Sequence, residues 1–250
     1  MLKVKDVYDY LCELAPLELQ MSFDNSGFQL GRIESGVKKV LLALDVTEDV
    51  VDEAIEQGAD LIVSHHPLIF TPLKNITDEK LLKLIENNIA VISMHTNLDI
   101  ADGGVNDVLI RALGAEPDSV LDTDGCGRVG VLAEDMDFDD FLSKCKDVLK
   151  TDGLRYYDSG RKIRKLAVMG GSGGGELYRA AELGCDVYVT ADVKYNQFLD
   201  ARELGISLID GDHFCTENLV IPELKDRLQE RFTEIVFSVS KKHGQIISFA

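Results

Sequence analysis

The chain carries the same pattern of helix, glycine, aspartate and strand at two places 126 positions apart. Residues 53–64 read EAIEQGADLIVS and residues 179–190 read RAAELGCDVYVT, and residues 37–40 resemble residues 163–166 at the same spacing. A continuous apolar run after each helix is typical of a strand buried on both faces of a parallel sheet. The repeat therefore predicts two related α/β lobes, each with a mostly parallel sheet.

Strands alternate with helices along the first lobe, which favours right-handed crossovers between parallel strands. Strands are expected at 37–44, 61–64 and 89–93, with helices over 4–14, 78–87 and 105–113 and another that Asp45 begins as its N-cap. We expect lobe one to cover about 1–125, and a middle strand–helix–strand segment with lobe two to cover about 126–250. No segment looks like an inserted extra domain.

Chemistry-bearing residues stand at expected strand ends in both lobes. His65 and His66 close the strand at 61–64, and Pro67 fits a chain that leaves the sheet there. His95 with Asp99 and His213 with Glu217 repeat one unit, a histidine followed by an acid four positions later. Because the carboxyl ends of parallel strands are where open α/β sheets hold ligands, we expect these six side chains to meet in a cleft between the lobes.

Imidazoles and carboxylates without a thiolate cluster suit zinc, manganese or iron. Several histidines and two acids exceed one mononuclear site, so the set predicts two divalent ions roughly 3.5–4 Å apart with a bridging carboxylate. The alternative is a hydrogen-bonded polar core between the lobes, in which these groups satisfy one another.

Two further polar stretches follow strands of the second half. The glycine-rich loop 170–175 enters a helix, and its backbone amides, those of Gly171 and Gly173 included, are candidates for binding a phosphate. A tight turn that permits close packing explains the loop equally well. Asp192 and Asn196 lie after another strand and are candidate substrate-binding residues, with a solvated loop as the alternative.

Charge and cysteine usage limit the partners. The formal net charge is −18, which makes nucleic acid an unlikely partner because phosphate backbones bind basic surfaces. No apolar run reaches the roughly 20 residues of a membrane span, and no signal-peptide pattern opens the chain. Five scattered cysteines argue against a disulfide framework, so we expect a cytoplasmic protein.

These motifs together resemble the dinuclear-metal family known as GTP cyclohydrolase type-two-like or NIF-three-like. The matching pieces occur in family order over almost the whole chain: residues 23–27 (FDNSG), 64–67 (SHHP), 95–99 (HTNLD) with Gly103, Gly104 and Asn106, 170–173 (GGSG), and Asp212 and His213 with Thr216 and Glu217. Two departures are Asn196, where the family often has a histidine, and Phe23, where tryptophan is common.

The resemblance implies a NIF-three-like fold, a toroidal homohexamer, and five metal ligands: His65, His66, Asp99, His213 and Glu217. Glu217 would bridge both ions, and His95 would be a nearby residue able to relay a proton. We therefore expect a metal-dependent hydrolase that acts on a nucleotide or another small anionic substrate. The alternative is a non-catalytic metal-binding scaffold or regulator that acts through protein partners.

Overall fold

The computed structural model describes residues 1–248, and their contacts divide the chain into two compact units. Unit 1 combines residues 1–102 with 221–244, and unit 2 combines residues 103–220 with the chain from 245 onward. The chain thus leaves unit 1 before the boundary expected near residue 125, because the helix over 105–112 packs within unit 2. The predicted division into lobes of about 1–125 and 126–250 stays a prediction.

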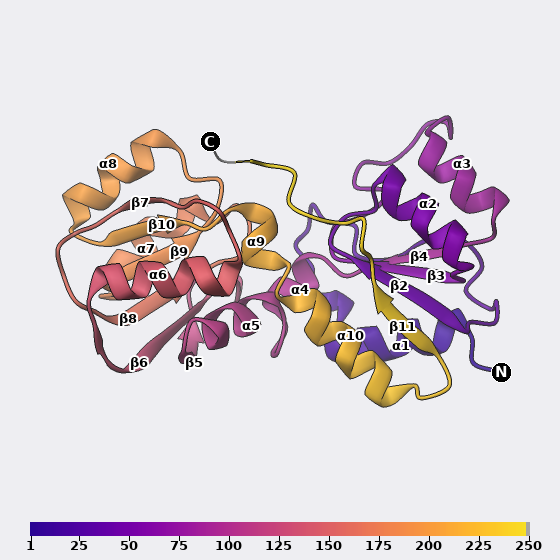
Figure 1. The fold of residues 1–250 in the computed structure, drawn as a ribbon, viewed down its shortest axis with the longest axis horizontal. Coiled ribbons are helices and arrows are strands. Elements are labelled where there is room, and N and C mark those ends of the chain that lie inside the picture. Colours follow the sequence, from indigo (N-terminus) through magenta and orange to yellow (C-terminus); the bar gives the residue numbers. More distant parts are fainter. Residues whose placement is uncertain (249–250) are drawn as a thin grey trace. The chain divides into compact units, whose positions relative to one another are not determined.

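Unit 1 is built on a five-stranded sheet with the order β1-β4-β3-β2-β11 (Figure 1). Its strands are β1 (Gly27–Leu30), β2 (Lys39–Ala43), β3 (Leu61–Ser64), β4 (Ala90–Ser93) and β11 (Val236–Val239). Its helices are α1 (Val4–Leu14), the 3-10 turn η1 (Leu17–Leu19), α2 (Glu48–Gln57), α3 (Glu79–Glu86), α4 (Thr96–Ile100) and, from its second residue on, α10 (Val220–Arg231). All neighbouring strands are parallel except β1, which pairs antiparallel with β4.

Unit 2 is built on a six-stranded sheet with the order β5-β6-β8-β9-β10-β7. Its strands are β5 (Ala115–Val120), β6 (Arg128–Met136), β7 (Arg155–Tyr157), β8 (Ile163–Val168), β9 (Val187–Thr190) and β10 (Ser207–Asp210). Its helices are α5 (Val105–Ala112), α6 (Phe138–Leu149), the 3-10 turn η2 (Gly174–Glu176), α7 (Leu177–Glu182), α8 (Tyr195–Leu204) and α9 (His213–Glu217).

The repeat seen in the sequence is a repeat of structure. Strands β2, β3 and β4 pair in parallel, as do β8, β9 and β10, and each set ends in an antiparallel edge strand. The Asp60 carboxylate accepts hydrogen bonds from the backbone amides of residues 38 and 39, and Asp186 does the same for residues 164 and 165. The aspartate after each glycine therefore fixes the start of the neighbouring strand, which explains why both halves carry it.

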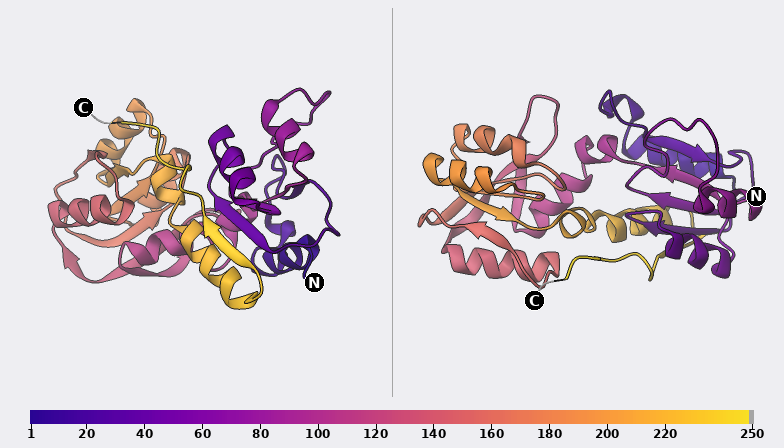
Figure 2. Two further views of the ribbon diagram at one scale, coloured as in Figure 1. Left: turned by 45° about the vertical axis from the view of Figure 1, so that its right-hand side comes forward. Right: turned by 90° about the horizontal axis from the view of Figure 1, so that it is seen from above.

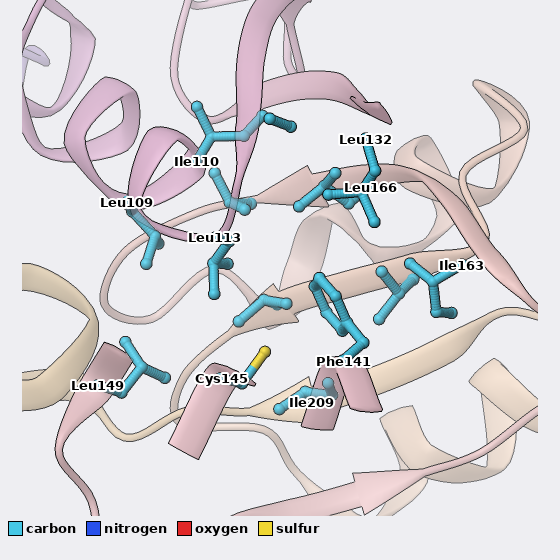
Figure 3. Packing of buried hydrophobic residues seen from close by; sticks show 14 of the residues in the cluster. Leu109, Ile110, Leu113, Leu132, Phe141, Cys145, Leu149, Ile163, Leu166 and Ile209 are labelled. Carbon is cyan, nitrogen blue, oxygen red and sulfur yellow. The ribbon is translucent and has the colours of Figure 1, made fainter. Parts of the chain in front are cut away.

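The core of unit 2 lies between its sheet and two helices. Leu109 of α5, its C-cap residue Leu113, and Phe141 and Cys145 of α6 pack against the sheet, where Leu166 lies in β8 (Figure 3). Helices α7 and α8 lie on the other face of the sheet (Figure 2). Both faces are thus covered, as the continuous apolar strands require.

The sheet of unit 1 is covered in the same way. Val50 and Val51 of α2 and Leu84 of α3 pack on Leu41 and Ile62 of the central strands. Helices α1 and α10 lie on the opposite side of that sheet (Figure 1). Among the described residues, no helix combines the length and apolarity needed to cross a membrane.

The start of α2 differs from the prediction. The N-cap is Thr47, whose hydroxyl accepts a hydrogen bond from the amide of Val50, so the assignment of Asp45 as the cap is wrong. Gly58 ends the helix with a left-handed backbone at φ +63, as expected. Asp45 lies two residues before the true cap and is therefore available for another contact, described below.

The C-terminal part of unit 1 is held by a buried carboxylate. Glu53 of α2 accepts hydrogen bonds from the hydroxyl of Ser240 and from the amides of Lys241 and Lys242. Burial by itself would raise the pKa of Glu53, but these hydrogen bonds outweigh it and hold the pKa below its ordinary value of 4.5. The charged form is thus stabilised by folding.

We expect Glu53→Gln to lower the free energy of unfolding at neutral pH by about 1–3 kcal/mol, because hydrogen bonds to a charged acceptor are lost. A pKa lowered by folding gives stability that is present above the ordinary value and lost as the pH falls through the folded pKa. The difference from wild type should therefore shrink below about pH 4.5 in urea titrations. Glu56→Gln, an exposed change on the same helix, is the control, and an equal effect there would contradict the assignment.

Candidate metal centre

Three histidines of unit 1 converge at the carboxyl ends of β3 and β4. His65 and His66 follow β3 directly, and His95 lies between β4 and α4. The ring centroid of His65 lies 5.0 Å from that of His66 and 5.3 Å from that of His95. One nitrogen from each ring belongs to a group within 4.8 Å, which is a spacing that a metal ion can occupy. Unit 1 thus brings together three of the four histidines that the strand-end argument selected.

Asp99 completes this group, which we call the first cluster (His65, His66, His95 and Asp99). It lies on α4, and its Oδ1 is 3.6 Å from Nε2 of His65. The amides of Leu98 and Asp99 both donate to the carbonyl of His95, so the short helix fixes the acid relative to the histidine before it. This local turn is the reason for the four-residue spacing.

Every histidine of the first cluster is oriented through Nδ1. That nitrogen lies 2.7–2.8 Å from an oxygen acceptor in each case. The pairs are His65 with the Met94 carbonyl, His66 with Asp45, and His95 with Asp24. Donation from Nδ1–H leaves the lone pair on Nε2. Histidines that bind a metal through one nitrogen usually donate from the other to a carbonyl or carboxylate oxygen, as these do.

Asp24 anchors the His95 side of the cluster. Its carboxylate also accepts from the amide and hydroxyl of Thr96 and from the hydroxyl of Ser26. Burial would raise the pKa of Asp24, but the hydrogen bonds from His95, Thr96 and Ser26 outweigh it and hold the pKa below its ordinary value. Asp24 therefore stays an anion that can stabilise a protonated His95.

The second cluster belongs to unit 2 and consists of His213, Glu217 and Asp192. His213 opens α9, and its Nδ1 lies 2.8 Å from Oδ2 of Asp192. Its Nε2 lies 3.2 Å from Oε2 of the buried Glu217, one turn later on the same helix. The imidazole is again held through Nδ1, and its Nε2 is paired with a carboxylate, as in the contact of His65 with Asp99.

Two carboxylates around one imidazole favour a positive charge. The hydrogen bond with Glu217, opposed by burial and supported by Asp192, raises the pKa of His213 to about 9. A site that concentrates negative charge in this way suits a divalent cation. The donors of both clusters are nitrogens of imidazole and oxygens of carboxylate, which fits zinc, manganese or iron.

The backbone around the second cluster is strained. Asp192 has φ +54 and Asp212 has φ +70, a region that residues other than glycine rarely adopt. Asp212 caps α9 by accepting from the amide of Cys215, and Asp192 holds His213. Strain of this kind collects at functional sites, where the surrounding structure imposes it.

The glycine-rich loop packs against the second cluster. A β-carbon at Gly171 would collide with Oε1 of Glu217 and approach Cε1 of His213 to 3.3 Å, so only glycine allows this approach. The amide of Gly171 donates to Thr216 and that of Gly173 donates to Thr190. Because the protein itself uses these donors, the contacts favour the packing interpretation of the loop over phosphate binding.

The other proposed substrate residues have different surroundings. Asp192 is engaged with His213, so its carboxylate acts on the histidine in this structure. Asn196 is exposed in the first turn of α8. A role in substrate binding stays a prediction for both residues and for Gly171 and Gly173.

Sequence reasoning missed the anchors Asp24 and Asp45. Asp45 lies two residues after β2, as His66 lies two residues after β3, so the strand-end rule that selected the histidines also applies to it. Asp24 lies far from His95 in sequence, and the signal for it was its place in the motif at residues 23–27 (FDNSG). Burial raises the pKa of the Cys215 thiol to about 11, which agrees with a structural role for that cysteine.

The fold and the clusters define a class: α/β proteins with two mixed sheets, each built around three parallel strands, and histidine–carboxylate groups at their strand ends. The chain belongs to the Duf34/NIF3 (NGG1p interacting factor 3) family, whose model matches residues 2–244. The expected family resemblance is therefore confirmed.

Individual relatives agree with this assignment over nearly the full length. A Clostridium perfringens protein named GTP cyclohydrolase 1 type 2 homolog is 36% identical, with 96% of this chain and 97% of that protein covered. The crystal structure of a Bacillus cereus protein related to NIF3 matches with a TM-score of 0.93 at 27% identity, covering 100% of this chain and 99% of the other. The structure of reduced HcgD from Methanocaldococcus jannaschii matches with a TM-score of 0.86 at 31% identity, covering 96% and 98%.

We expect Gly171→Ala to lower the free energy of unfolding by about 1–3 kcal/mol, because the residue has φ +66 and its new methyl group meets Glu217. Gly175→Ala is the matched control, since a β-carbon there meets nothing within 4 Å. Chemical denaturation of both variants measures the difference. Equal stabilities would show that close packing is not the reason for glycine at position 171.

Proposed function

We propose that the two clusters together bind two divalent metal ions and that the protein is a metal-dependent hydrolase. The proposed ligands are His65, His66, Asp99, His213 and Glu217, and the metal is zinc, manganese or iron. The single observation that carries the proposal is the orientation of all four clustered histidines through Nδ1 by a carbonyl or carboxylate oxygen. A carbonyl or carboxylate acceptor on one imidazole nitrogen is the usual surrounding of a metal-binding histidine, whereas a polar core does not require it at every ring.

Divalent ions bound there would supply Lewis acidity and make a nearby water more acidic. The chain's own residues provide orientation and proton transfer. Asp24 faces Nδ1 of His95, which leaves Nε2 as the nitrogen that gains and loses a proton. The lowered pKa of Asp24 keeps its carboxylate negatively charged beside Nδ1. His95 is thus suited to take a proton from the attacking water and to pass it to the leaving group.

The substrate class is a nucleotide or another small anionic molecule. The relatives' name, GTP cyclohydrolase 1 type 2 homolog, supports a screen that begins with GTP and continues with other nucleotides and phosphoesters. A net charge of −18 disfavours a polyanion such as nucleic acid and restricts anion binding to the metal centre. The proposal also includes a cytoplasmic location and a homohexameric ring, both carried over from the sequence and its family resemblance.

Elemental analysis of protein purified without chelator should find two transition-metal ions per chain. We expect His65→Ala to lose at least one ion and Glu217→Ala, which removes the proposed bridge, to lose both. His243→Ala is the control, because His243 lies outside the clusters and accepts a hydrogen bond from the Leu44 amide through Nδ1. Two ions retained in both ligand variants would overturn the site, and the histidines would then be a polar core.

His95→Gln tests the division between ligands and proton relay. We expect it to keep two ions per chain and to lower kcat on the substrate found in the screen by about 10²–10⁴-fold, with little change in KM. The pH profile of kcat should lose one limb, since a glutamine does not titrate. Loss of metal in this variant would contradict the relay and make His95 a ligand.

A further inference from the structure

Two phenylalanines beside the first cluster are exposed to solvent. Phe23 is 62% exposed and Phe70 is 48% exposed, although burial of either ring would be favourable. Their ring centroids lie 6.4 Å apart with an angle of 57° between the ring planes. A single exposed apolar side chain needs no explanation, but two aromatic rings in contact at the edge of a polar site mark a place for a ligand.

The pair is continuous with the histidines. The ring of Phe70 meets His95 edge to face, with centroids 6.1 Å apart and an interplanar angle of 85°. His95 in turn lies 5.3 Å from His65 and 5.6 Å from His66. A row of rings therefore leads from solvent to the proposed ligands, and Phe70 contacts the residue to which we assign proton transfer.

The loops that carry the two phenylalanines are fixed to each other. The side chain of Asn25 donates to the carbonyl of Ile69 at 2.6 Å, one residue before Phe70. Gln29 accepts from the amide of Ile69 at 3.1 Å, while Asp24 is held by Thr96. The backbone beside each exposed ring is thus ordered by hydrogen bonds. A preformed surface of this kind binds without the entropic cost of ordering two loops.

We propose that Phe23 and Phe70 form an aromatic platform on which the substrate stacks a planar heteroaromatic ring. A phenyl ring stacks face to face with another planar ring, and it has no hydrogen-bonding groups of its own. A ring bound in this way lies close to His95, because Phe70 contacts the imidazole of that residue. This inference rests on the proposed function and narrows its substrates to molecules that join such a ring to an anionic group.

Isothermal titration of the metal-loaded protein tests the platform with three probes: GMP, CMP and ribose 5-phosphate. The three share a sugar phosphate, and only GMP and CMP carry a heteroaromatic ring. We expect wild type to bind GMP about 10- to 100-fold more tightly than ribose 5-phosphate, from the usual strength of base–aromatic stacking. We call this ratio of affinities the ring advantage. The smaller ring of CMP should give a smaller advantage.

The variants separate stacking from general loss of structure. Phe23→Ala and Phe70→Ala should each reduce the ring advantage, while affinity for ribose 5-phosphate and the metal content stay unchanged. Phe70→Tyr should retain the advantage, because it keeps the aromatic face. Leu73→Ala is the matched control, since Leu73 is 50% exposed on the same loop as Phe70.

The outcomes distinguish this inference from the proposed function. Two bound ions with no ring advantage in wild type would overturn the platform and leave the metal site standing. A ring advantage that depends on both phenylalanines, in a protein that takes up no metal even after reconstitution, would support the platform and refute the dinuclear site. If Phe23→Ala and Phe70→Ala instead lower the oligomeric mass in light scattering and leave the ring advantage intact, the pair is a contact between copies and the platform is wrong.

Discussion

The hydrogen bond behind each clustered histidine is the interaction on which the proposed chemistry depends. A neutral imidazole carries its proton on one nitrogen and a lone pair on the other. An acceptor that faces one nitrogen fixes the proton there and leaves the lone pair on the other nitrogen. The Met94 carbonyl does this for His65, and the carboxylates of Asp45 and Asp24 do it for His66 and His95. These acceptors also limit rotation of the rings, so the donors are oriented before any ion arrives.

The rest of each unit serves to hold these groups at strand ends. Buried parallel strands cannot shift without exposing their apolar side chains, and the aspartates at 60 and 186 tie neighbouring strands together at their opposite ends. Asp192 and Asp212 have an unusual backbone, and Gly171 approaches Glu217 closely, beside the second cluster. The cost of that geometry is met by the stability of the sheet around it.

Much of the fold was accessible from sequence because its signals are local and repeated. The helix–glycine–aspartate–strand pattern predicted β3 and β9 at their observed residues, and the apolar spacing predicted α1 and α3 closely. Strands β5 and β11 were missed, since β5 contains a proline and three polar residues and β11 lies at the edge of its sheet. The N-cap of α2 was misplaced because Asp45 and Thr47 are both good caps, and only the contact with His66 separates them.

The sequence by itself determined the elements, their repetition and the candidate ligands, because hydrophobic periodicity and residue chemistry are carried by neighbours in the chain. Tertiary structure alone decided which oxygen faces which imidazole nitrogen, since those acceptors come from turns and strand ends distant in sequence. It also decided that the glycine loop packs against Glu217 and that Phe23 lies beside Phe70 at the edge of the histidines. Contacts of this kind depend on how separate segments meet in space, and no local pattern encodes them.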